Sequence, residues 1–273
     1  MTNRRPTDAL DKAVHALMRD AAERAILPRF RTLDDAEVMH KAVDDVVTIA
    51  DRDAEAILTE GLGRLLPEAA IVGEEAAHAD PSLMNRLGDD LCWIVDPLDG
   101  TNNFAAGKAP FGILVALAER GVAVSGWIYD VLTGRFCHAH RGMGAFVNAE
   151  RTAARTTGQQ PPVAGISLLF MDDAKREAMK RHIAPFYTLV DIPRCAAEQY
   201  PRLALGVNDV SIFERTLPWD HAAGALFVNE AGGKVARMDG SDYRVDEDRK
   251  GLIGAASPAL WNDLAQRLRQ IES

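Results

Sequence analysis

The chain is poor in cysteine, and its cysteines lack the spacing of a pairing or metal-binding motif. Cys92, Cys137 and Cys195 are the three in 273 residues, and none belongs to a Cys-x-x-Cys pattern. Scattered thiols of this kind argue against a disulfide framework and against a cysteine-ligated zinc site. We therefore expect reduced core cysteines in a cytoplasmic protein.

Long apolar runs and targeting segments are also missing. Arg4 and Arg5 are not followed by an apolar stretch, so no signal peptide is evident. No run approaches the length of about 20 apolar residues that a membrane-spanning helix needs. We found no internal repeat, and we expect no membrane association.

Basic residues are outnumbered, with 31 Lys and Arg against 40 Asp and Glu and a net charge of −9. Nucleic-acid binding needs basic patches, so nucleic acid is not expected as a main partner. The apolar and charged fractions are ordinary for a globular protein of one large or two coupled domains. In so acidic a chain, a site built from carboxylates needs cations in order to hold an anion.

The most informative segment is Trp93–Phe104, which reads Trp-Ile-Val-Asp-Pro-Leu-Asp-Gly-Thr-Asn-Asn-Phe. A β-branched strand runs into Asp96 and Asp99, which are separated by a stiffening proline and a leucine. We expect both carboxylates to converge just beyond the strand, where oxygen ligands favour hard divalent cations. The backbone amides of Gly100 and Thr101 are placed to receive an anion, as at a helix N-terminus. Cations beside an anion cradle indicate phosphate chemistry.

Three other segments each bring an acid to the end of an element. Residues 70–75 form a short apolar strand that ends in Glu74, and residues 45–51 carry acids around a β-branched centre. Asp220 begins an alanine-rich helix that we expect to end at Gly232-Gly233.

Together these segments resemble the inositol monophosphatase family of Mg²⁺-dependent, lithium-sensitive phosphatases. The family signature Asp-Pro-(Ile/Leu)-Asp-Gly-Thr-x-Asn-(Phe/Tyr), preceded by an apolar pair, is matched by Ile94–Phe104. Trp-Asp-x-Ala-(Ala/Gly)-Gly is matched by Trp219–Gly224. Shorter family segments are matched by Gly73–Glu75, Val47–Asp51 and Gly142–Asn148, all in the family's order. The likeness extends from about residue 10 to the C-terminus.

The resemblance implies a layered α/β/α/β/α sandwich with the active site between its two halves, whereas periodicity alone predicts only an α+β or α/β fold. A polar stretch with Gly158 and Pro161-Pro162 predicts the boundary between an N-terminal subdomain (1–155) and a C-terminal subdomain (156–273). We expect helices at about 10–21, 54–62, 172–183, 195–205, after Trp219 and from Pro258, and strands at 111–119, 122–130, 135–139, 144–148 and 163–170.

The expected metal ligands are the side chains of Glu74, Asp96, Asp99 and Asp220 and the backbone carbonyl of Leu98. Two or three Mg²⁺ ions would activate a water and neutralise the departing oxygen. The catalytic residues are expected to be Glu74, Thr101 and Asp51. Thr101 would orient the attacking water through its hydroxyl, and Asp51 would hydrogen-bond to Thr101 as its base partner.

Each acid also has a simpler interpretation. Asp96, Asp99 and Asp220 are residue types that commonly cap helices. His221 follows an expected ligand, yet on a helix it projects about 100° away, so we expect it to pack. His138 and His140 alternate on a strand with no third ligand close in the sequence, so zinc is not expected there.

The expected substrate-binding residues are Asp99, Gly100, Thr101, Cys195, Ala196, Glu214, Arg215 and Asp220. Where the family usually has Gly-(Ser/Thr)-Ala, this chain reads Arg194-Cys195-Ala196, and the usual sugar-binding acid is displaced to Glu214. We expect Arg194 or Arg215 to meet a second anionic group, since arginine forms bidentate pairs with such groups.

Three classes of function remain. The first is a phosphomonoesterase acting on inositol monophosphate or a similar small polyol phosphate, with histidinol phosphate, fructose 1,6-bisphosphate and phosphoadenosine phosphate as the family's alternatives. The second is a non-catalytic interaction protein that retains the fold, and the third is a metal-dependent module that only binds phosphate. The complete set of expected ligands favours the first class. The resemblance also implies a homodimer.

Overall fold

The computed structural model describes residues 8–33, 38–42 and 45–272. The helices are α1 (Asp8–Ala21), α2 (Ile49–Leu65), α3 (Glu74–Ala79), α4 (Thr101–Ala105), α5 (Asp173–His182), α6 (Ala196–Ala204), α7 (Pro218–Glu230) and α8 (Pro258–Glu272). The strands are β1 (Val38–Ala42), β2 (Asp45–Thr48), β3 (Ala70–Gly73), β4 (Cys92–Asp99), β5 (Gly112–Glu119), β6 (Val122–Asp130), β7 (Phe136–His140), β8 (Gly144–Val147), β9 (Glu150–Thr152), β10 (Val163–Ile166), β11 (Thr188–Leu189), β12 (Val210–Phe213), β13 (Lys234–Ala236) and β14 (Leu252–Ala255).

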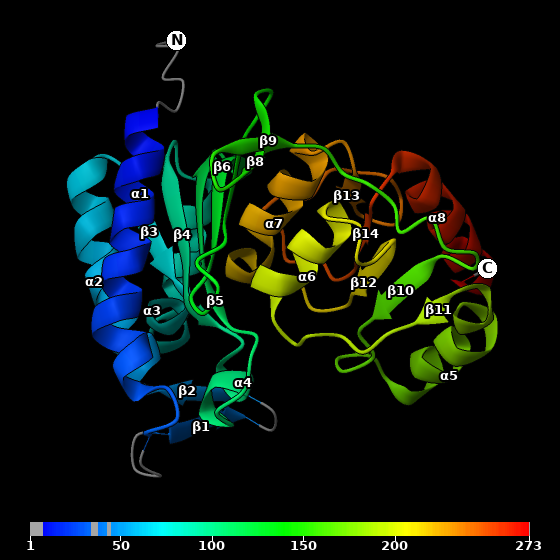
Figure 1. Cartoon of the computed structure of the whole chain (residues 1–273), viewed down its shortest axis with the longest axis horizontal. Coiled ribbons are helices and arrows are strands. Elements are labelled where there is room, and N and C mark those ends of the chain that lie inside the picture. Colours follow the sequence, from blue (N-terminus) through cyan, green and yellow to red (C-terminus); the bar gives the residue numbers. More distant parts are fainter. Residues whose placement is uncertain (1–7, 34–37, 43–44, 273) are drawn as a thin grey trace.

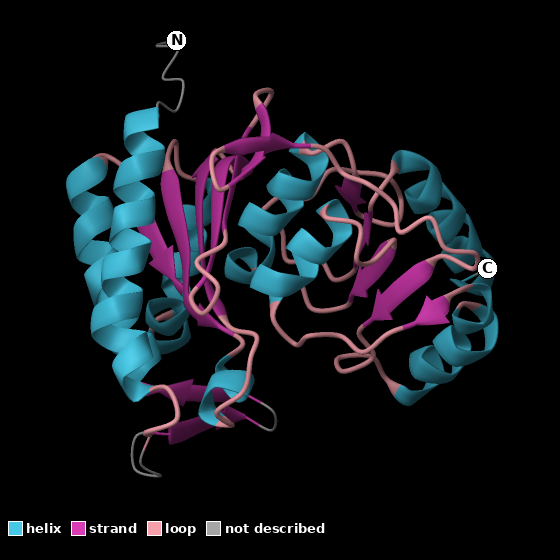
Figure 2. Cartoon of the chain, in the orientation of Figure 1, coloured by secondary structure: helices cyan, strands magenta, loops and turns pink. Residues whose placement is uncertain are grey.

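Two large sheets and three layers of helices alternate along the long axis of the molecule, and β1 and β2 form a separate two-stranded sheet (Figures 1 and 2). Helices α1 and α2 cover the outer face of a seven-stranded sheet ordered β3-β4-β5-β6-β7-β8-β9. Helices α6 and α7 lie between it and a five-stranded sheet ordered β11-β10-β12-β14-β13, whose outer face carries α5 and α8. The expected α/β/α/β/α sandwich is confirmed.

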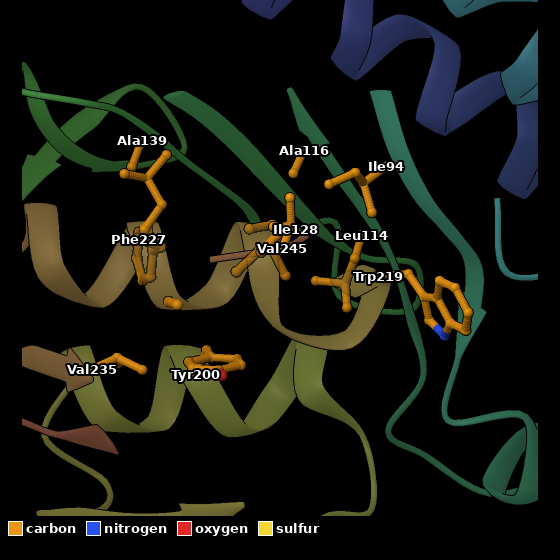
Figure 3. Close-up of a cluster of buried hydrophobic side chains, with 14 of the residues drawn as sticks. Ile94, Leu114, Ala116, Ile128, Ala139, Tyr200, Trp219, Phe227, Val235 and Val245 are labelled. Atoms are coloured by element: carbon orange, nitrogen blue, oxygen red, sulfur yellow. The ribbon is translucent and has the colours of Figure 1, made fainter. Parts of the chain in front are cut away.

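Helix α7 explains why the layers stack in this way. Ten of its 13 residues are buried, and its sequence is apolar on every side. A helix without a polar face is stable only between two covering layers. Figure 3 shows Phe227 of α7 and Tyr200 of α6 within the central core, which also contains Ile94, Leu114 and Ile128 of the first sheet.

The chain passes from the first sheet to the second between β9 and β10, along the polar segment that contains Gly158. Helix α7 nevertheless packs against strands of the first sheet, so the two halves share one core. The division at residue 155 into two subdomains stays a prediction.

The expected strand at 163–170 is too long. Strand β10 ends at Ile166, and the backbone turns so that the amide of Met171 approaches the carbonyl of Leu168. Leu169 and Phe170 continue the apolar pattern, but their side chains are 40% and 46% exposed. The sequence pattern could not separate strand residues from apolar residues on the wall of a cleft.

Within the part of the chain that the structure describes, no helix is both long enough and apolar enough to cross a membrane.

Replacing Gly224 with alanine should lower the free energy of unfolding by about 1–3 kcal/mol, the usual cost of overpacking a core. A Cβ at this position in α7 would overlap the buried ring of Tyr200. Gly63→Ala in α2 is the matched control, because a Cβ there would lie 3.6 Å from Cδ1 of Ile71. Alanine should stabilise that helix by up to about 1 kcal/mol. Urea denaturation measures both variants, and equal stabilities would contradict the close packing of α6 on α7.

Candidate active site

An extra residue in β4 brings Asp96 and Asp99 to the same side of the strand. Asp96 lies opposite Leu114 of β5 and Asp99 lies opposite Gly112, so three steps along β4 match two along β5. Residues three apart on a regular strand point to opposite faces, and one inserted residue reverses this relation. The bulge falls between Asp96 and Asp99, a segment that contains Pro97, which has no N–H to donate to the neighbouring strand.

Asp96 is 1% exposed and is surrounded by other acids. Its pKa is raised well above the usual value, first by burial and then by the negative charges of Glu74, Asp99, Asp220 and Asp51. Glu74, Asp96, Asp99 and Asp220 line one cleft with a volume of about 170 Å³. Such a concentration of negative charge fits a site for divalent cations, because cations would offset the repulsion that burial intensifies.

Glu74 is the first residue of α3, directly after β3. The carboxylate of Glu55 on α2 holds this helix start, accepting hydrogen bonds of 2.8 Å from the amides of Glu75 and Ala76. We did not predict Glu55 as a positioning residue. Its signal in the sequence is an acid three positions before Leu58, on the apolar face of α2.

Thr48 and Asp51 form a capping box at the start of α2. Asp51 Oδ2 accepts hydrogen bonds of 2.7 Å from both the amide and the hydroxyl of Thr48. Its Oδ1 accepts the hydroxyl proton of Thr101 at 2.9 Å, so the predicted Thr101–Asp51 hydrogen bond is present. Burial raises the pKa of Asp51 to about 6, although the hydrogen bonds from Thr48 oppose the shift.

The start of α6 contacts Asp99 directly. Asp99 Oδ2 accepts a hydrogen bond of 2.6 Å from the amide of Ala197, and the thiol of Cys195 lies 3.8 Å from the backbone oxygen of Asp99. Cys195 and Ala196, two of the expected substrate-binding residues, line the cleft. Gly100 has φ of +86°, and a Cβ there would lie 2.9 Å from the carbonyl oxygen of Pro110, so this turn needs glycine.

The same cleft is also lined by charged side chains from the part of the chain after residue 190, including Arg194, Glu214 and Arg215. Arg215 Nη2 lies 3.8 Å from Asp220 Oδ2, and its guanidinium lies 4.3 Å from the ring centre of Phe170. Glu214 accepts a hydrogen bond of 2.7 Å from Nζ of Lys175. Lys175 was not predicted, because α5 is distant from the motifs in the sequence.

His221 packs, as expected. It is 3% exposed, with Nδ1 2.6 Å from the hydroxyl of Tyr200 and Nε2 2.9 Å from the carbonyl oxygen of Arg215. Burial lowers the pKa of His221 to about 3, which removes it as a proton carrier near neutral pH.

No third ligand lies close to His138 and His140 in the sequence, but the fold brings one to them. Asp11 of α1 joins them, and one ligand atom from each residue lies within 4.8 Å of the other two. Among the described residues, no three of the cleft carboxylates approach one another so closely. This cluster was not predicted from the sequence, because Asp11 and His140 are 129 positions apart in the chain.

Comparison with known proteins agrees with this geometry. The chain matches the inositol monophosphatase family over residues 7–273. A Caulobacter vibrioides protein named inositol-1-monophosphatase is 31% identical over 268 residues, covering 96% of this chain and 98% of that protein. A Vibrio cholerae protein named Nus factor SuhB is 32% identical over 248 residues, covering 88% of this chain and 90% of that protein. The crystal structure of the suppressor protein suhB from Bartonella henselae superimposes with a TM-score of 0.82 and 25% identity, covering 96% of this chain and 99% of that one.

The chain belongs to the inositol monophosphatase family, and this membership supports a phosphatase.

Asp96→Asn should make the protein more stable once divalent cations have been removed. The amide removes a buried charge but keeps the oxygen that accepts the amide proton of Leu98. We expect a gain of about 1–3 kcal/mol, since one unit of pKa shift corresponds to about 1.4 kcal/mol. Urea denaturation in a chelating buffer measures it, with Asp90→Asn as control because that side chain is 85% exposed. A variant less stable than the parent would contradict the repulsion argued here.

Proposed function

We propose that this protein is a Mg²⁺-dependent phosphomonoesterase that hydrolyses a small polyol phosphate of the inositol monophosphate type. The observation that carries the proposal is the gathering of Glu74, Asp99 and Asp220 around the buried Asp96 in one cleft. Hard cations prefer such oxygen donors. The proposed ligands are Glu74, Asp96, Asp99, Asp220 and the carbonyl of Leu98, for two or three ions.

When bound, the cations supply a water of lowered pKa and stabilise charge on the departing oxygen. The rest is done by the protein's own groups. The hydroxyl of Thr101 has one proton and two acceptors, Asp51 Oδ1 at 2.9 Å and the Leu98 carbonyl at 2.8 Å. Donation to Asp51 leaves the oxygen lone pairs of Thr101 facing the attacking water. As Thr101 Oγ1 takes the proton of that water, its own proton would pass to Asp51 Oδ1. Asp51 serves as the base partner, held in place by Thr48.

The cleft wall supports a substrate that carries polar groups beyond its phosphate. Gly100 and Thr101 are proposed to bind the phosphate, while Cys195, Ala196 and Glu214 contact the alcohol part. Arg215 and Arg194 favour a substrate with a second anion, which keeps fructose 1,6-bisphosphate and phosphoadenosine phosphate as alternatives. Glu214 favours hydroxyl groups or the amine of histidinol phosphate. We also propose a cytoplasmic homodimer that is inhibited by Li⁺, as the family resemblance implies.

The test is phosphate release from a panel of inositol 1-phosphate, histidinol phosphate, fructose 1,6-bisphosphate and phosphoadenosine phosphate. Each is assayed without divalent cations, with millimolar Mg²⁺, and with added Li⁺. We expect Mg²⁺-dependent turnover of at least one substrate and its suppression by Li⁺. Absence of turnover throughout, with Mg²⁺ bound, would contradict the proposal. It would then favour a non-catalytic interaction protein that retains the fold.

Thr101→Val should lower kcat by about 10²–10⁴-fold, the range for losing a positioned proton acceptor. Valine matches the shape of threonine but cannot bond to Asp51. Thr101→Ser is the control, because it keeps the hydroxyl and should retain most of the activity. Mg²⁺ affinity, measured by calorimetry, should be nearly unchanged in both. If valine and serine reduced kcat equally, the hydroxyl would not take part in proton transfer.

A further inference from the structure

A second group of ligand-type side chains lies apart from the cleft, beneath α1. Asp11 on α1 meets His138 and His140, which alternate on β7 and therefore point to the same face of the first sheet. The intervening Ala139 belongs instead to the central core beside α7. The cluster is therefore on the face opposite to α7, where α1 covers the sheet (Figure 1).

The separations of the donor atoms suit a small tetrahedral ion. Asp11 Oδ2 lies 3.1 Å from His140 Nε2 and 3.6 Å from His138 Nδ1. Ligands bound at about 2.1 Å to a tetrahedral Zn²⁺ stand roughly 3.4 Å from one another. The side chains of His138, His140 and Asp11 are only 11%, 3% and 15% exposed, so the cluster is largely dry.

His138 is only 9% exposed, and its Nδ1 atom is buried without a hydrogen-bond partner among the described residues. The distance of 3.6 Å to Asp11 is too long for a hydrogen bond. The ring is held between Phe136 and Phe146, with ring centres 5.3 and 5.1 Å away. Burial lowers the pKa of His138, which favours the neutral form that binds metals. A buried nitrogen without a partner costs free energy that a bound cation would recover.

The surrounding residues orient the other two donors. His140 Nδ1 lies 3.0 Å from the hydroxyl of Ser125, a contact that leaves Nε2 facing Asp11. The indole N–H of Trp127 donates to Asp11 Oδ1 at 2.8 Å. Both oxygens of Asp11 lie close to His140 Nε2, Oδ1 at 2.9 Å and Oδ2 at 3.1 Å, and Oδ2 also lies 3.6 Å from His138 Nδ1. Metal-binding histidines usually have their second nitrogen hydrogen-bonded in this way.

We propose that Asp11, His138 and His140 bind a transition-metal ion of the Zn²⁺ class, which fastens α1 to β7. Two imidazoles and one carboxylate select Zn²⁺, Co²⁺ or Ni²⁺ over Mg²⁺, which prefers oxygen ligands. Asp8, one helical turn before Asp11 and exposed, or a water would complete four ligands. The site is independent of the phosphatase proposal, because it shares no residue with the cleft.

The test uses the full-length, metal-free protein with Co²⁺ as an optical probe. Millimolar Mg²⁺ is present throughout so that the oxygen-rich cleft does not compete for Co²⁺. We expect a stoichiometric visible absorption typical of tetrahedral Co²⁺ with nitrogen ligands, displaced by Zn²⁺, and a higher melting temperature with Zn²⁺. Absence of this spectrum would overturn the proposal and leave the cluster as buried Asp–His pairing alone.

Two variants locate the site. His138→Phe keeps an aromatic ring between Phe136 and Phe146, and Asp11→Asn keeps the side-chain shape. Each should weaken Zn²⁺ binding by at least about 10-fold. His182→Ala, on the exposed face of α5, is the matched control and should bind as the parent does. Circular dichroism checks folding, and Asp11→Asn decides the question if His138→Phe does not fold. Unchanged Zn²⁺ affinity in the folded variants would place the ion elsewhere.

Discussion

The repulsion among buried carboxylates around Asp96 is the constraint on which the rest of this structure depends. Without cations, Glu74, Asp99 and Asp220 all disfavour the charged form of Asp96, and burial intensifies the effect. Such a group of acids stays together only if each acid is fixed by a rigid element. The five layers supply these elements, since the acids come from β4, α3 and α7, which pack into the cores between the layers. On the proposed function, stability is thereby traded for a cation site.

Helix N-termini are the common device that makes this arrangement tolerable. Asp51, Glu74 and Asp220 lie in the first turns of α2, α3 and α7. Asp99 accepts a hydrogen bond from the first turn of α6. The positive end of a helix stabilises a nearby negative charge by about 0.3–1 kcal/mol, and by up to about 2 kcal/mol when partly buried. On the proposed function, the same helix ends would also suit a phosphate, because bound cations would neutralise the acids.

Some of this was predictable from the sequence and some was not, for physical reasons. The convergence of Asp96 and Asp99 follows from a local motif, and the capping pair Thr48 and Asp51 lies within one helical turn. The layered fold came from the family resemblance, since periodicity alone predicted only its class. Glu55 was missed because its contact with α3 spans 20 positions. The end of β10 was misplaced because apolar residues that line a cleft resemble strand residues.

The cluster beneath α1 also could not be predicted from the sequence, because Asp11 and His140 are 129 positions apart. It also raises the question of how the two proposed metal sites would differ in the ions they bind. The cleft offers carboxylate oxygens, whereas Asp11 shares its site with two imidazoles. Because imidazole nitrogens bind Mg²⁺ poorly and favour Zn²⁺, the proposed site beneath α1 would exclude Mg²⁺ by the chemistry of its donors. A Zn²⁺ ion beneath α1 would strengthen the outer layer of the sheet that carries β4. The two sites would then be linked mechanically, through the rigidity of that sheet, and not through any shared ligand.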